Sequence, residues 1–132
     1  MKFKLLLLFL LLSTSIGFSQ NSLVEDNRIY TKVDVMPVYE EGEEAFYKYI
    51  KINYITPNVN KSIKGQIIVQ FIVEKDGSLT DIKVVEDLGY GTGEEAVRVL
   101  SKSKKWIPGY KDGYPVRVRY TVPISLSIKM PN

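Results

Sequence analysis

Polar and apolar residues alternate along the last part of the chain, from Val116 to Ile128. Every second residue of this segment is apolar or aromatic, and the residues between them are polar apart from Pro123. A repeat of two residues is typical of a strand with one face on a core and the other in water. Proline lacks the N–H that a central strand donates, so Pro123 favours an edge position, and we expect this strand to leave one edge open.

A second alternating segment runs from Gln66 to Glu74, and the turn Lys75–Ser78 joins it to a third segment, Leu79 to Glu86. An Asp-Gly pair in the turn supplies the positive backbone torsions of a tight hairpin. Ile68 and Ile72 lie on the face opposite the main apolar row. Apolar residues on both faces indicate that this strand is central in its sheet.

Two further segments have the spacing of amphipathic helices. The first begins after Gly42 and ends before Pro57, and the second follows the glycine-rich loop Leu88–Gly93. Thr92 and Glu95 have the spacing of a capping box, with Thr92 as the N-cap. The element order is helix, strand, strand, helix, strand. It predicts an α+β domain with two helices packed on one face of a three-stranded antiparallel sheet.

Residues 1–20 have the features of a secretory signal peptide: a basic start, the apolar run Leu5–Leu12, and small residues before a cut near Ser19–Gln20. The apolar run is shorter than the roughly 20 residues of a membrane-spanning helix. We therefore expect cleavage and a periplasmic location. Residues 21–35 then form an N-terminal lead-in, and residues 36–132 form the folded domain.

Composition narrows the classes of function. Removal of the two lysines of the signal lowers the formal charge from +3 to about +1, so charge gives no reason to expect nucleic acid as a partner. The chain has no cysteine and no histidine, which removes the commonest catalytic bases, nucleophiles and metal ligands. The acidic residues at positions 40 to 44 suit the start of a helix. We expect no catalysis, no cofactor and no metal.

Short motifs along the chain, taken together in their order and spacing, resemble the C-terminal domain of the TonB energy transducers. These motifs are Gly42–Phe46, Asn53, Pro57, Gly65, the hairpin Val69–Ser78, Glu94–Ala96, Trp106 with Pro108–Gly109, Asp112–Gly113, Pro115–Val118 and Tyr120–Ile124. The resemblance runs from about Pro37 to Leu126. It implies a non-enzymatic module that captures a short extended segment of an outer-membrane receptor, the TonB box, as an added strand.

In this family the receptor peptide pairs beside the last strand, so the resemblance implies a binding edge within Val116 to Ile128. The candidate residues are Val116, Arg117, Val118, Arg119, Tyr120, Thr121, Val122, Ile124 and Ser125. The implied partners are N-terminal segments of outer-membrane TonB-dependent receptors or other envelope proteins, or a second copy of the chain pairing through this edge. Arg117 and Arg119 either steer acidic residues of the peptide or lie on a solvated face.

The sequence departs from the family pattern in several places. Thr56-Pro57 stands where the family often has Tyr-Pro, and the segment from Pro57 to Gly65 is shorter. The membrane helix and Pro-rich span of a complete transducer are missing, so we expect an exported TonB-like domain. The alternative is an envelope or cell-wall adaptor that uses the lysine-rich segment Lys102–Trp106. A carboxylate-pair glycosidase is a distant third, because it needs a deep cleft that so small a sheet seldom supplies.

Overall fold

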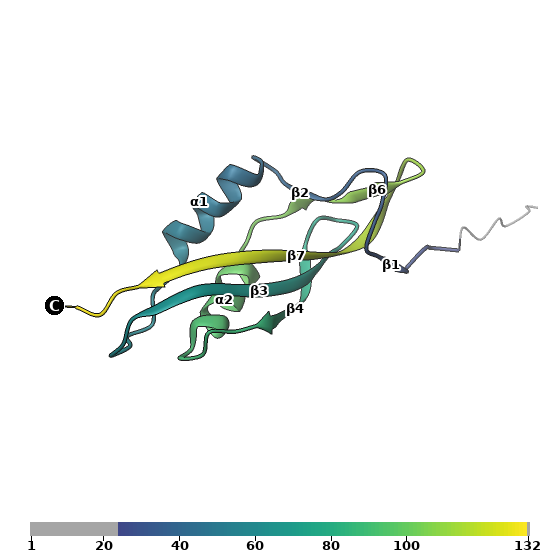
Figure 1. Ribbon diagram of the computed structural model, residues 1–132. Coiled ribbons are helices and arrows are strands. Elements are labelled where there is room, and N and C mark those ends of the chain that lie inside the picture. The colour runs from purple at the N-terminus through teal and green to yellow at the C-terminus, as the bar shows by residue number, and fades with distance from the viewer. Residues whose placement is uncertain (1–23, 132) are drawn as a thin grey trace, which may run out of the picture.

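The computed structural model describes residues 24–131, so the expected signal peptide lies outside the described residues. Two helices and a long hairpin alternate with several short strands, and a long strand ends the fold (Figure 1). The elements are β1 (Ile29–Tyr30), β2 (Val38–Tyr39), α1 (Glu43–Asn53), β3 (Ile63–Val73), β4 (Leu79–Glu86), α2 (Thr92–Ser101), β5 (Trp106–Ile107), β6 (Gly109–Lys111) and β7 (Tyr114–Ile128).

The main sheet is built on β3 and β7, which pair antiparallel from Ile63 opposite Ile128 to Val73 opposite Val118 without a break in register. Because β4 pairs with the other side of β3, β3 is central, which confirms the prediction from its two apolar faces.

The prediction of a three-stranded antiparallel sheet is correct only for β4, β3 and β7. The short strand β1 adds to β7 in parallel, and β6 pairs with the start of β7, so the sheet is mixed. Strands β2 and β5 form a second, two-stranded sheet. Strands of two or three residues are too short to show an alternating pattern, and the sequence therefore gave no signal for them.

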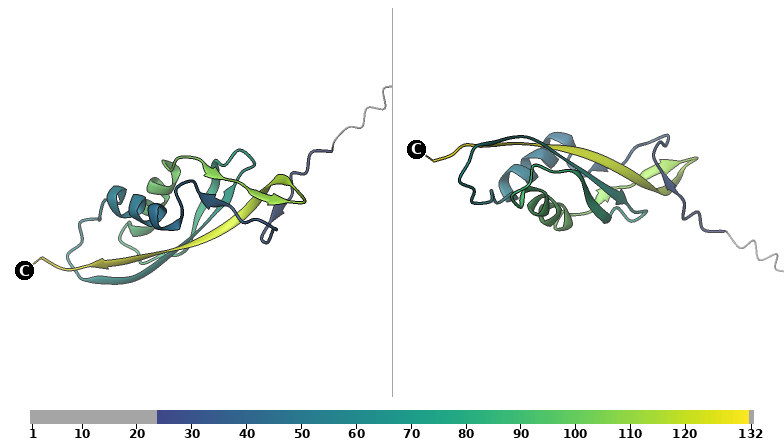
Figure 2. Two further views of the ribbon diagram at one scale, coloured as in Figure 1. Left: turned by 90° about the horizontal axis from the view of Figure 1, so that it is seen from above. Right: turned by 60° about the horizontal axis from the view of Figure 1, so that its bottom comes forward.

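Both helices lie on one side of β3 and β7, as predicted (Figure 2). Helix α2 packs against β4 and β3. The predicted capping box is wrong, because the N-cap of α2 is Gly91, with a left-handed φ of 82°. Thr92 is instead fully buried, and its hydroxyl donates to the carbonyl oxygen of Gly89. The Glu95 carboxylate accepts a hydrogen bond from the Ile55 N–H, beyond the end of α1.

The core is organised around Trp106, whose residue surface is only 5% exposed. Its ring centroid lies 4.9 Å from that of Phe46, 5.3 Å from Phe71, 5.4 Å from Tyr120 and 6.0 Å from Tyr39. Tilted and edge-on aromatic pairs contribute about 0.5–1.5 kcal/mol each beyond their buried area. Since these rings come from α1, β3, β7 and β2, Trp106 fixes the position of α1 relative to β7.

The turn between β3 and β4 lies against the backbone of Trp106. As predicted, Asp76 acts in this turn, where its carboxylate accepts hydrogen bonds from the backbone and the hydroxyl of Ser78. The Trp106 N–H donates to the carbonyl oxygen of Gly77 at 2.8 Å. The hairpin turn is thereby tied to the aromatic core.

Replacing Gly77 with alanine is expected to destabilise the fold more than the same change at Gly113. Both glycines have a positive φ, 85° and 81°, which costs an alanine roughly 1–2 kcal/mol. A Cβ at Gly77 would also overlap the carbonyl oxygen of Trp106, whereas a Cβ at Gly113 meets nothing within 4 Å. Urea unfolding measures the loss of stability in each variant. Equal losses would contradict the role given to the contact between Gly77 and the backbone of Trp106.

Replacing Trp106 with alanine is expected to lower the free energy of unfolding by about 3–5 kcal/mol, because a large buried ring is lost. The matched control is Ile107→Ala, since Ile107 is the next residue of β5 and is 42% exposed. The free energy of unfolding of Ile107→Ala should fall by about 1 kcal/mol or less. Thermal melts followed by circular dichroism compare the two variants, and similar melting temperatures would show that Trp106 does not organise the core.

Candidate functional site

One edge of β7 is occupied near its start and open beyond that point. Arg117 and Val118 pair with β1, and Val118 pairs with β3 on its other side. From Arg119 to Ile128, β7 pairs only with β3 within residues 24–131. We call this stretch the open edge.

The open edge includes most of the predicted binding residues but not all of them. Arg119, Tyr120, Thr121, Val122, Ile124 and Ser125 lie on it. Arg117 and Val118 are taken up by β1, and Val116 pairs with Gly109 of β6. Short strands that the sequence did not reveal pair with the first part of β7, so the open part of the candidate edge begins at Arg119.

Pro123 shows which backbone groups of β7 face the open edge. It lies opposite Ile68 in the unbroken ladder with β3. Alternate residues of a strand direct their N–H and C=O groups to opposite neighbours. A proline fits in such a ladder where its nitrogen faces away from the partner strand. The nitrogen of Pro123 therefore faces the open edge, and the N–H groups of Thr121 and Ser125 face it too.

The side chain of Arg117 is engaged within the fold. Its guanidinium donates two hydrogen bonds to the Glu74 carboxylate, at 2.8 and 3.0 Å, and a third to the carbonyl oxygen of Asn27 before β1. The hydrogen bonds from Arg117 hold the pKa of Glu74 below its usual range. Arg119 is held more loosely, with 3.7 Å between its Nη1 and Asp81 Oδ2. Both arginines therefore have a carboxylate partner within the fold, and the partner of Arg119 lies across β3, on β4.

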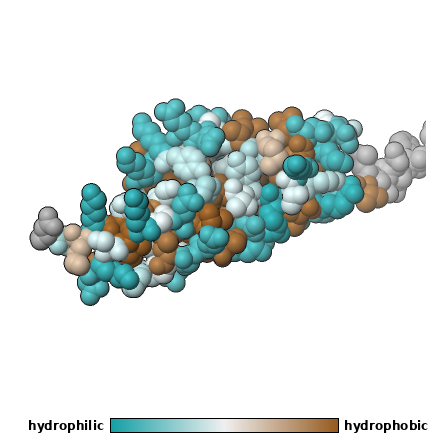
Figure 3. All heavy atoms as spheres, viewed as in Figure 1, coloured by the Kyte–Doolittle hydropathy of each residue, from teal (hydrophilic) through white to brown (hydrophobic). Residues whose placement is uncertain are grey.

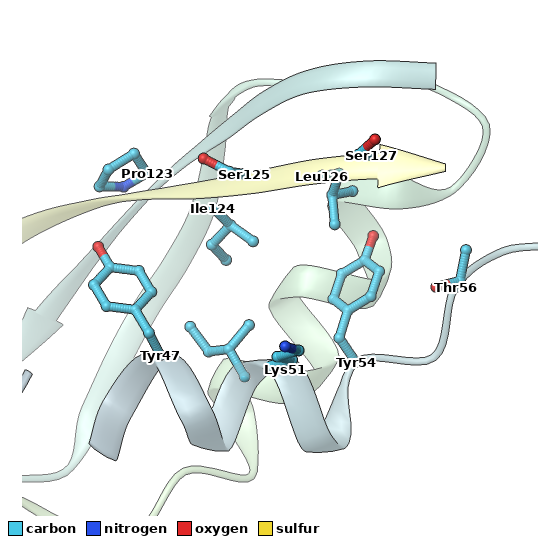
Figure 4. A pocket seen from close by; sticks show the side chains of 10 residues that line it. Tyr47, Lys51, Tyr54, Thr56, Pro123, Ile124, Ser125, Leu126 and Ser127 are labelled. Carbon is cyan, nitrogen blue, oxygen red and sulfur yellow. The ribbon is translucent and has the colours of Figure 1, made fainter. Parts of the chain in front are cut away.

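A groove of about 550 Å³ separates α1 from the open edge (Figure 4). The side chains of Tyr47 and Tyr54 rise from α1 toward β7, and Lys51 lies between them. Figure 3 shows pale, brown and teal atoms side by side in this part of the surface, in keeping with a lining of aromatic, aliphatic and charged residues. We call it the α1–β7 groove; it is lined by Tyr47, Ile50, Lys51, Tyr54, Thr56 and Pro123–Ser127.

Polar contacts with α2 hold α1 in place beside the groove. The hydroxyl of Tyr49 donates to the carbonyl oxygen of Val99, and that of Tyr54 donates to the carbonyl oxygen of Thr92, both at 2.8 Å. Arg98 donates to the carbonyl oxygen of Asn53 at the end of α1. Burial raises the pKa of Tyr54 to about 12, so this phenol remains a donor at neutral pH.

Two of the residues by which α1 lines the groove, Tyr47 and Lys51, were not found from the sequence. The helical spacing of Phe46, Tyr49, Ile50 and Tyr54 predicts one buried face, and Phe46 and Ile50 are indeed buried. Tyr47 and Lys51 form a second stripe, four residues apart on an adjacent face. Since one is aromatic and the other charged, hydrophobic periodicity does not connect them.

The lysine-rich segment proposed for cell-wall binding carries no exposed aromatic ring, because Trp106 is buried. Lys104 pairs with Glu41, one of the acidic residues before α1, and Lys105 approaches Asp76 at 3.6 Å. In the part of the chain that the structure describes, no cluster of three or more acidic side chains is arranged to hold a metal ion. No helix among these residues is long and apolar enough to cross a membrane.

Comparison with known proteins identifies the family. Residues 57–128, more than half of the chain, match the family described as Gram-negative bacterial TonB protein C-terminal. No curated protein and no solved structure matches the chain. The matched segment includes β3, β4, α2 and β7, and therefore the open edge, whereas α1 precedes it. The chain belongs to the TonB C-terminal domain family, whose members are protein-interaction modules of the cell envelope.

Proposed function

We propose that this domain binds extended segments near the N-termini of outer-membrane TonB-dependent receptors by adding each segment as a strand along the open edge. Family membership supports the class of partner. The observation that carries the proposal is the edge from Arg119 to Ile128, where β7 has a partner strand on one side only among the described residues. Unpaired N–H and C=O groups at such an edge bind an extended peptide without regard to its sequence.

The two edges of the main sheet differ in a way that favours β7 over β4 as the binding edge. Strand β4, at the other edge, is irregular in register at two places and carries Asp81 with a φ of 47°. Bulges and charged side chains are the usual means by which proteins protect an edge from pairing. Strand β7 keeps a regular register with β3, and Arg119 is the one charged residue between Arg119 and Ile128. Strand β7 is therefore the better template for an added strand.

The proposed function is non-enzymatic and periplasmic, with export through the signal peptide expected at residues 1–20. The same edge would accept β7 of a second copy of the chain, and this pairing would compete with receptor segments. A cell-wall adaptor is not favoured, because the aromatic residue of the lysine-rich segment belongs to the core.

Titration of the purified, isotope-labelled protein with receptor N-terminal peptides is expected to shift backbone amide signals between residues 119 and 128. Signals of β4 should change little and serve as the internal control. Sedimentation at each peptide concentration separates peptide binding from self-pairing. The proposal fails if near-millimolar peptide leaves the amides of the open edge unshifted.

Thr121→Pro is expected to weaken this binding by several-fold while the fold is retained. The substitution removes an N–H that faces the open edge, and a hydrogen bond contributes about 0.5–1.5 kcal/mol. The matched control is Val122→Pro, which removes an N–H directed to β3 and should lower the melting temperature instead. Unchanged peptide affinity in Thr121→Pro would contradict strand addition at this edge.

Pro123→Thr is expected to have the opposite effect. Threonine restores the missing N–H at the centre of the open edge and suits an exposed position of a strand. One added hydrogen bond should tighten peptide binding by roughly twofold to tenfold. Isothermal titration calorimetry with one receptor peptide compares this variant with the parent protein, and weaker binding by the variant would argue against the assigned direction of this backbone position.

A further inference from the structure

We propose that the α1–β7 groove selects extended segments that carry one basic and one acidic side chain four residues apart, both on the face turned toward α1. This inference rests on the proposed addition of a strand at β7. It adds the chemistry of the side chains by which one segment is preferred over another.

Two charges of α1 lie toward opposite ends of the open edge. Glu43 lines a small hollow together with Tyr120 and Val122. Lys51 lines the groove together with the later residues Ile124–Ser127. Within residues 24–131, neither Glu43 nor Lys51 belongs to an ion pair. Both are therefore available to a segment lying between α1 and β7.

The spacing of these charges fits a strand. Lys51 follows Glu43 by eight positions along the helix, which corresponds to about 12 Å at 1.5 Å per residue. An extended strand covers this distance in about four residues, at roughly 3.3 Å each. Because four is an even number, the two matching side chains of the added strand point to the same face. A basic residue opposite Glu43 and an acidic residue opposite Lys51 thus both face α1.

Tyr47 lies between the two charges and faces the groove (Figure 4). Its residue surface is 36% exposed, so part of its ring is free to contact a ligand. Burial raises the pKa of Tyr47, and the nearby charge of Glu43 acts in the same direction, in agreement with Glu43 at this end of the groove. An apolar side chain midway between the two charges would pack on this ring. The preferred pattern is basic, any, apolar, any, acidic, or its reverse, according to strand direction.

The test uses synthetic peptides of one composition with alternating apolar and polar residues. Two peptides place Lys and Glu four residues apart, one in each order, and two control peptides place them three residues apart, so that one charge faces away from α1. Affinities are measured at low salt for the purified protein and for two double variants. One double variant combines Glu43→Gln with Lys51→Gln, and the other combines Glu44→Gln with Lys48→Gln. The last pair is the matched control, because Glu44 and Lys48 are outside the residues that line the groove.

At least one peptide with four-residue spacing should bind roughly twofold to fivefold more tightly than the peptides with three-residue spacing, because these lose one exposed ion pair. This advantage should vanish in the variant changed at Glu43 and Lys51 and persist in the control variant. Equal affinity at both spacings, or an advantage that survives the loss of Glu43 and Lys51, would overturn the inference while leaving strand addition intact. If none of the peptides shifts the amides of residues 119–128, the proposed function itself fails.

Discussion

The position of α1 over β7 depends on the packing of Trp106. Helix α1 has 11 residues, and a helix of this length is marginal in water on its own, so it depends on tertiary contacts. At its first turns Phe46 packs on Trp106, and Trp106 in turn contacts Phe71 of β3 and Tyr120 of β7. At its other end, contacts with α2 hold it. The width of the groove is therefore set by core packing and by the contacts of α1 with α2.

The long elements could be predicted from the sequence because their patterns repeat. The alternation in β3 and β7 and the helical spacing in α1 and α2 belong to elements of ten or more residues. The Asp-Gly turn was predictable from local backbone chemistry, since Gly77 has the positive φ it requires. Strand β1 was not, because Ile29–Tyr30 is ordered by pairing with β7, and the carbonyl oxygen of the preceding Asn27 accepts a hydrogen bond from the distant Arg117. Such contacts leave no local pattern.

The sequence predicted the candidate site as a single strand, β7. In the structure, helix α1 forms the other side of the groove beside this strand. Resemblance to a family pointed to β7, and the open edge lies there. The opposite wall comes from α1, and sequence reasoning assigned α1 entirely to the core because its aromatic residues have helical spacing. Tyr54 shows the difficulty: its hydroxyl is bonded to α2, yet its ring lines the groove. Only the placement of α1 relative to β7 separates these two roles.

Under the proposed function, the open edge has to bind receptor segments and reject other strands. Strand β1 ends the open edge at Val118, and Pro123 removes one outward N–H near its middle. The outward donors are thus divided into two short runs, around Thr121 and around Ser125. A segment that offers only backbone hydrogen bonds gains less from such an edge than from a continuous one. Side chains that fit the α1–β7 groove would supply the missing stabilisation, which moves recognition from the backbone to the groove.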